Sequence, residues 1–62
     1  MKKYRFICTK ENENGYENAT LLLDDTKDIL GKVFVAITFN TKVRNEIFKT
    51  YIAVDSICAL VE

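Results

Sequence analysis

Few side chains in this 62-residue chain are of the kind that catalysis or metal binding requires. The sequence contains no His, and its two cysteines, Cys8 and Cys58, do not form a CxxC pair. A serine nucleophile needs a base within reach, and without His the chain offers Ser56 few candidates. A zinc site usually needs four Cys or His ligands, which the sequence cannot supply. We therefore expect no catalytic residue and no bound metal.

Two other short patterns also have a structural interpretation. Asp24 and Asp25 are adjacent carboxylates, but in a polar connector such a pair typically caps a turn. Neither Gly15 nor Gly31 belongs to a phosphate-binding glycine motif. The sequence thus predicts a protein that is not an enzyme and that carries no cofactor.

Basic and aromatic residues alternate over residues 39–51, which suggests a binding surface. If this segment forms a hairpin, Lys42, Lys49 and Tyr51 share one face and Arg44 lies at the tip. Such a face could bind single-stranded nucleic acid, with bases stacked on the tyrosine and cations beside the phosphates. We retain nucleic-acid binding as the alternative function, because a net charge of zero does not favour it.

The strongest strand pattern, at residues 32–40, favours a protein partner instead. Its valine, isoleucine and phenylalanine side chains alternate onto one face, while Phe34 and Ala36 make the other face apolar as well. A small β domain with a second apolar face usually covers it with another chain. We therefore predict protein–protein contacts, with self-association as their simplest form. The candidate binding residues are Phe34, Lys42, Arg44, Lys49 and Tyr51.

The length of the chain predicts a single domain over residues 1–62 with a small core. A core of this size contributes no more than roughly 3–5 kcal/mol, so small domains often gain stability by association. No segment has the length of a signal peptide or a membrane span, and we expect a cytoplasmic protein with reduced thiols and no membrane contact. The bias toward Lys, Asn, Ile and Glu is typical of AT-rich prokaryotic or phage genomes, which suggests an accessory protein that binds a host protein.

Charge is distributed unevenly along the chain. Residues 1–10 contain four basic residues and no acid, whereas residues 11–28 contain six acids and one lysine. Folding could therefore give one basic and one acidic face, although a mixed, solvated surface is the simpler expectation.

Alternation of apolar and polar residues predicts an all-β fold. We expect a polar connector with a single helical turn over residues 24–31. The segment around residues 42–50 also has helical spacing, so an α+β fold with a helix there is the alternative. The five predicted antiparallel strands are at residues 3–9, 17–23, 32–41, 47–54 and 57–61.

Two details of this prediction can be tested. In the first strand, the aromatic pattern places Tyr4, Phe6 and Cys8 on one face. In the hairpin, a two-residue turn at residues 44–45 would place Phe39 opposite Thr50.

The closing segment TYIAVDSICALVE, residues 50–62, is too long for one straight strand in so small a domain. We expect Asp55 and Ser56 to form a corner, after which Ile57, Ala59 and Val61 enter the core. The segment resembles the last two strands of Sm-like proteins over these thirteen residues, mainly in its hydrophobic pattern. This resemblance implies a meander curled into an SH3-like or Sm-like barrel. The family's Gly and Asp/Asn signatures are absent from the rest of the chain, so ring assembly and RNA binding are not carried over.

Overall fold

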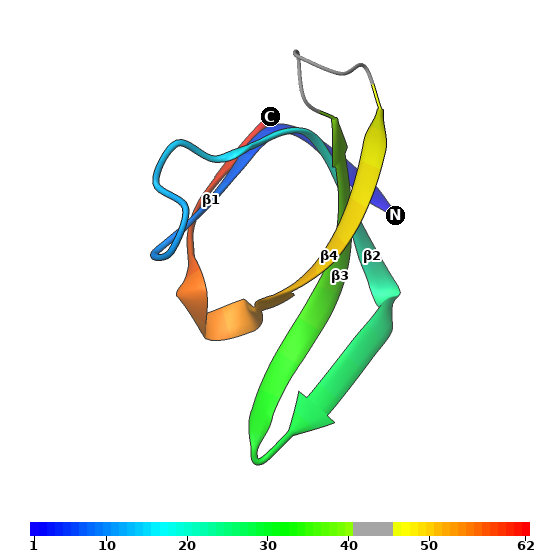
Figure 1. Ribbon diagram of the computed structural model, residues 1–62, viewed down its shortest axis with the longest axis vertical. Coiled ribbons are helices and arrows are strands. Elements are labelled where there is room, and N and C mark those ends of the chain that lie inside the picture. Colours follow the sequence, from blue (N-terminus) through cyan, green and yellow to red (C-terminus); the bar gives the residue numbers. More distant parts are fainter. Residues whose placement is uncertain (41–45) are drawn as a thin grey trace.

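A computed structural model describes residues 1–40 and 46–62, which form one five-stranded antiparallel sheet (Figure 1). The strand order is β4-β3-β2-β1-β5, and a single 3₁₀ turn, η1, joins the last two strands. The all-β prediction is confirmed, and the helix around residues 42–50 is wrong for residues 47–50, which begin β4. The elements are β1 (Lys2–Thr9), β2 (Tyr16–Ile29), β3 (Lys32–Asn40), β4 (Ile47–Ala53), η1 (Val54–Ser56) and β5 (Ile57–Val61).

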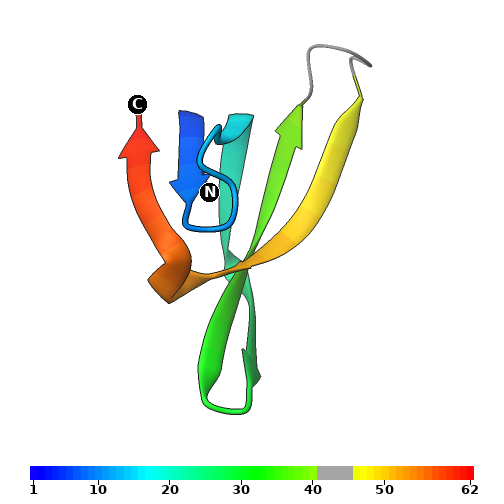
Figure 2. The ribbon, with the colours of Figure 1, turned by 60° about the vertical axis from the view of Figure 1, so that its left-hand side comes forward.

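The sheet is strongly curled but open. Strands β4 and β5 form its two edges and diverge from η1, with the other three strands between them (Figure 2). Within the described part of the chain, neither edge pairs with the other, so the sheet does not close into a barrel. Strand β2 occupies the centre of the sheet.

The core lies inside the curl and is small. Around it, the Tyr16 and Phe39 rings meet edge to face at 4.8 Å, and Phe39 stacks on Phe48 at 5.7 Å. Such aromatic pairs add specific geometry to a core that contains few large side chains. The buried hydrophobic cluster consists of Ile7, Ala19, Leu21, Val35, Ile37 and Ile52.

The inward face of β1 differs from the aromatic pattern. Ile7 and Thr9 are buried, while Phe6 is exposed and Cys8 is half-buried. The curl of the sheet, rather than the position of the aromatic residues, decides which face of β1 points inward. Ile7 lies between Tyr16 on β2 and Leu60 on β5, so it has a paired strand on each side.

The predicted helical turn over residues 24–31 is replaced by an extension of β2. The pairing with β3 jumps from Leu22↔Ala36 to Thr26↔Val35, so that residues 23–25 form a bulge with no partner on β3. Pairing then continues to Ile29↔Lys32. The sequence did not reveal this extension because its three aspartates and the glycine that follows it are typical turn residues.

Beyond this bulge, β2 and β3 form a projecting hairpin. The last β3–β4 pair is Phe34↔Ala53, so residues 28–33 pair only with one another. We call residues 28–33 the arm, and its projection beyond η1 is visible in Figures 1 and 2. It contributes to the elongated shape of the molecule, which measures 35 × 20 × 19 Å.

Strands β3 and β4 form the predicted hairpin with a register shifted by two residues. Phe39 lies opposite Phe48 instead of Thr50, and the last described pair before the loop is Asn40↔Ile47. Because the shift is even, each side chain stays on the predicted face of the sheet.

The predicted corner is confirmed at η1. Ser56 is buried, and its hydroxyl donates a hydrogen bond of 2.7 Å to the carbonyl of Ala53. The core assignment that followed from this corner is only partly correct, since Ala59 is exposed, while Ile57 and Val61 are half-buried. Strand β5 is an edge strand, so β1 is its one neighbour in the sheet and its other edge is unpaired.

Candidate functional site

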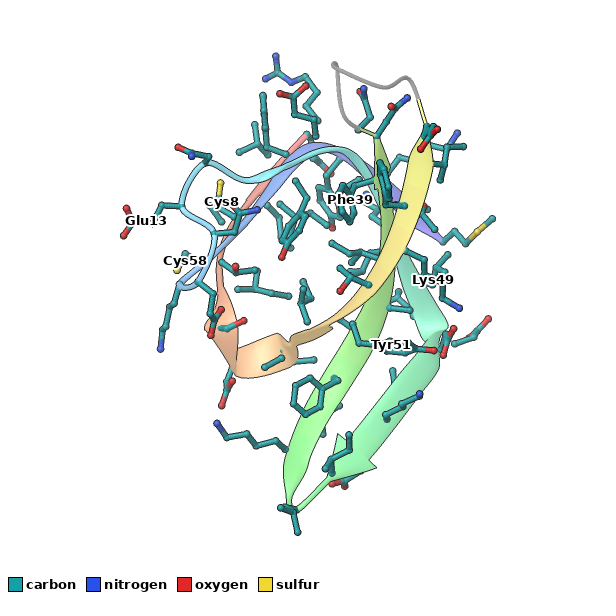
Figure 3. All side chains as sticks on the ribbon, in the orientation of Figure 1. Cys8, Glu13, Phe39, Lys49, Tyr51 and Cys58 are labelled. Atoms are coloured by element: carbon teal, nitrogen blue, oxygen red, sulfur yellow. The ribbon has the colours of Figure 1, made fainter. Side chains whose placement is uncertain are left out.

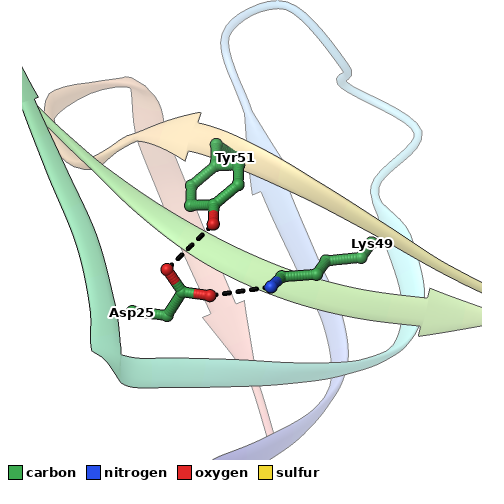
Figure 4. A network of polar contacts seen from close by, with 3 residues as sticks. All are labelled: Asp25, Lys49 and Tyr51. Atoms are coloured by element: carbon green, nitrogen blue, oxygen red, sulfur yellow. Dashed lines mark hydrogen bonds and ion pairs between the residues drawn. The ribbon is translucent and has the colours of Figure 1, made fainter.

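Three polar side chains form a network on the face of the sheet opposite the core (Figure 4). The Asp25 carboxylate accepts a hydrogen bond of 2.9 Å from the Tyr51 hydroxyl. Its second oxygen lies 2.7 Å from the Lys49 ammonium nitrogen. The ammonium of Lys27 lies 4.4 Å from the centre of the Tyr51 ring, within cation–π range. Tyr51 thus contacts both Asp25, which is paired with Lys49, and Lys27.

The sheet positions these groups on either side of one small residue. Lys49 and Tyr51 alternate onto the outer face of β4, while Asp25 belongs to the β2 bulge. Between them runs β3, where Ala36 lies opposite Tyr51 and opposite Leu22. Because Ala36 has a single methyl group, side chains from the two flanking strands can meet above it. Its exposed fraction is 0%.

The network changes the acidity of its members. Hydrogen bonds from Lys49 and then from Tyr51 hold the pKa of Asp25 below its ordinary value. The same contact with Asp25 raises the pKa of Lys49. Both side chains remain partly exposed, so the ion pair is a surface pair of modest energy.

The structure brings together some of the predicted binding residues. Lys49 and Tyr51 are adjacent, as expected, and Phe34 lies half-buried on the same face, opposite Ala53. Figure 3 shows the side chains of Lys49 and Tyr51 on the outside of the curled sheet. Lys42 and Arg44 lie outside the described residues.

Sequence reasoning missed the two β2 members of the network. Asp25 was interpreted as a turn cap and Lys27 as part of a connector. Both positions depend on the bulge and on the continuation of β2, neither of which has a local sequence signal here. The mixed charge of residues 24–28 was the one indication that this segment could face a basic strand.

The network alters what this face can bind. Lys49 is paired with Asp25, and the Tyr51 ring already contacts Lys27. A base that stacked on Tyr51 would have to displace these contacts, and an incoming phosphate would meet the Asp25 carboxylate. Among residues 1–40 and 46–62, no group of three or more acidic or cysteine side chains is placed to hold a metal ion.

Large apolar side chains are exposed elsewhere on the molecule. Phe34 and Ala36 do not form the open apolar face that the sequence suggested, because Ala36 is buried and Phe34 is half-buried. The exposed apolar residues of the described part of the chain lie instead on the arm, at the bulge, in η1, on strands β1, β4 and β5, and at the N-terminal methionine. They are Met1, Phe6, Leu23, Ile29, Leu30, Val33, Ile47, Val54 and Leu60.

Two surface hollows accompany these features. The larger hollow, of about 400 Å³, lies beside β1 and β2 and is lined by Lys3, Tyr4, Arg5 and Thr20 among others. The smaller hollow, of about 260 Å³, lies at the base of the arm. It is lined mainly by apolar and aromatic side chains, with Glu11, Thr9 and Ser56 as its polar members. The apolar and aromatic residues are Tyr16, Phe34, Tyr51, Ile52 and Ala53.

The two cysteines lie on neighbouring strands. Cys8 on β1 is opposite Ala59, the residue that follows Cys58 on β5, and both thiols are free. Cys58 is exposed, whereas Cys8 is half-buried.

Comparisons with family models, with curated proteins and with solved structures found no match to this chain. In the described part of the structure, no helix is long and apolar enough to cross a membrane. The surface and the core of this chain therefore carry the information about its function.

Proposed function

We propose that this protein is a non-enzymatic binding module that acts through protein–protein contacts and associates with itself. One observation carries this proposal. Among residues 1–40 and 46–62, nine large hydrophobic side chains are exposed, whereas only seven hydrophobic residues are buried, and two of these are alanines. So small a core leaves little stability in an isolated chain of this length. A second chain that covers some of the exposed hydrophobic side chains would add the buried apolar surface that the core lacks.

The accessible surface supports the same proposal. The chain exposes 4586 Å². A compact monomer of this mass exposes roughly 4,100 Å². The excess of about a tenth comes with an open sheet and a projecting arm, two features that association would cover. Strands β4 and β5 also present unpaired edges, which natural proteins usually protect.

Sedimentation velocity over a wide range of protein concentrations tests this function. We expect a concentration-dependent equilibrium between monomer and a larger species, together with a Tm that rises with protein concentration. A single monomeric species at millimolar concentration would exclude self-association. Binding to a different protein would then be the remaining protein-binding role.

Single-stranded nucleic-acid binding is the alternative function, and one observation favours it. Lys27 and Lys49 flank the exposed side of Tyr51, so two cations and an aromatic ring lie together. Nucleic-acid binding ranks second because Asp25 pairs with Lys49 and accepts a hydrogen bond from the Tyr51 hydroxyl. A labelled oligonucleotide should bind with an affinity that falls steeply with salt, and absence of binding at low salt would exclude this alternative.

The strand order and the composition support two further elements of the proposal. The order of strands, with η1 before β5 and β5 beside β1, supports an SH3-like or Sm-like relationship, in which closure would require contact between β4 and β5. The composition supports a cytoplasmic accessory protein of prokaryotic or phage origin that binds a host protein. The genes that neighbour its own would test this context directly.

A further inference from the structure

The tip of the arm is unfavourable for an isolated chain in two ways. Leu30 is fully exposed, at 100%. It also adopts a left-handed backbone conformation with a φ of 52°, followed by Gly31 at 83°. Two consecutive positive φ values between the paired residues Ile29 and Lys32 are typical of a type I′ turn. Asn or Asp usually precedes the glycine in such a turn, and a large aliphatic residue there is an outlier.

Neighbouring side chains extend this apolar tip. Ile29 is 52% exposed and Val33 is 46% exposed, and both adjoin the turn. The arm pairs only with itself, so none of these side chains contributes to the core. An outlier of this kind indicates a functional requirement when the folded chain gains nothing from it. Here the requirement is an apolar contact with another surface.

We propose that the arm tip docks on a second copy of this chain. The two arms lie antiparallel about a two-fold axis, and Leu30 of each copy enters the smaller hollow at the base of the other copy's arm. This inference rests on the proposed self-association and names the surfaces that carry it.

The dimensions of the arm and the hollow agree with this arrangement. The hollow is lined by Phe34 and Ala53, the pair at which β4 ends and the arm begins. From there to Leu30 the arm extends by roughly 10 Å, at about 3.4 Å per residue. Two arms side by side therefore place each tip at the other's base. The hollow volume of about 260 Å³ exceeds that of the four side-chain carbons of leucine, since each carbon occupies about as much volume as a water molecule, about 30 Å³.

The contact area favours a second copy over an unrelated partner. A specific interface buries about 800 Å² on each partner, which three exposed aliphatic side chains cannot supply from one side. In a two-fold dimer every contact occurs twice, so each copy contributes both a tip and a hollow. The arrangement is closed, and it gives a dimer rather than an extending chain.

Charge agrees with the same pairing. Lys32 follows the turn glycine at the arm tip and is exposed. Glu11 lines the hollow that would receive the tip of the other copy, and it is exposed as well. Antiparallel arms would bring each lysine near the glutamate of the other copy, where opposite charges favour the docked orientation.

Leu30→Asn is the decisive variant, because Asn-Gly is the preferred sequence for a type I′ turn. The substitution should maintain or raise the stability of the monomer and weaken dimerisation by at least tenfold. Sedimentation equilibrium measures the dimer dissociation constant, and urea unfolding at a concentration below that constant measures monomer stability. Leu23→Asn is the matched control, since Leu23 is 60% exposed at the bulge but lies outside the arm. Its dissociation constant should change by less than threefold.

A charge exchange tests the antiparallel arrangement itself. Lys32→Glu and Glu11→Lys should each weaken the dimer, and the double variant should recover most of the lost affinity. If wild type dimerises and Leu30→Asn leaves its affinity unchanged, or if Leu23→Asn weakens it equally, the arm is not the contact, although self-association stands. If wild type remains monomeric throughout, both this inference and the proposed self-association are wrong.

Discussion

Asp25 and Lys49 lie 2.7 Å apart although they belong to strands that are not neighbours in the sheet. The ion pair passes over β3 at the row that contains Ala36, and Tyr51 forms a hydrogen bond to the same carboxylate. This contact links the bulge of β2 to the edge strand β4. The network therefore holds the curl of the sheet from its outer face, while the core holds it from inside.

Replacing Asp25 with Asn should lower the free energy of unfolding slightly at neutral pH, because the ion pair is partly exposed. The pKa of Asp25 is held below its ordinary value of 3.8 by Lys49 and Tyr51. Its stabilising effect is therefore complete above pH 3.8 and is lost as the pH falls through the lowered pKa. Urea unfolding at several pH values should show wild type and variant converging in acid.

Sodium chloride gives an independent test of the same pair. High salt should reduce the difference between wild type and Asp25→Asn, since exposed ion pairs are screened. A difference that stays constant from pH 6 to pH 2 would show that Asp25 acts through packing instead of charge.

Gly15 and Gly31 provide a second prediction, because both have positive φ values but different surroundings. A methyl group added at Gly15 would lie 3.1 Å from the sulfur of Cys8, whereas one at Gly31 meets nothing within 4 Å. Each Gly→Ala change should cost about 1–2 kcal/mol through backbone strain. Gly15→Ala should cost more, and chemical denaturation of both variants measures the difference. Equal losses would mean that Cys8 moves aside freely.

Ala36 should be intolerant of larger side chains. It is fully buried beneath the Asp25 network, so Ala36→Leu should destabilise the fold by roughly 1–3 kcal/mol through overpacking. Ala59→Leu is the matched control on an exposed strand position and should change stability by less than about 0.5 kcal/mol. Thermal unfolding followed by far-UV circular dichroism distinguishes the two outcomes. If both variants are equally stable, the outer face can open without loss.

Ser56→Ala tests the corner at η1. The substitution removes the hydrogen bond to the Ala53 carbonyl and should cost about 0.5–1.5 kcal/mol. Asp55→Ala changes an exposed neighbour in the same turn and should have little effect on stability. A larger loss in the Asp55 variant would show that its charge, and not the serine hydroxyl, maintains the corner.

The strands and the corner could be predicted from sequence because alternation and β-branched runs are local signals. The bounds of β1, β3, β4 and β5 lie within one residue of the expected ones. The faces of β3 and β4 were also correct, although the register was shifted by two. Loop length determines that register, and a weak turn sequence such as Arg-Asn does not specify it.

Several features that could not be predicted depend on the β2 bulge. Three residues without partners redirect the strand, extend it through acidic residues that usually favour turns, and bring Asp25 to Lys49. No local pattern encodes where a bulge forms, because it results from the fit between whole strands. The inward face of β1 was missed for the same reason, since the curl of the whole sheet determines it.

The arm also gives this fold one dimension that can vary during evolution. Because its residues pair only with one another, cross-strand pairs can be added or removed there without moving any buried residue. The same insertion in β1 would reverse every side chain beyond it. Homologues that differ in the length of this hairpin would retain the same core, and the reach of the hairpin would change by about 3.4 Å for each pair.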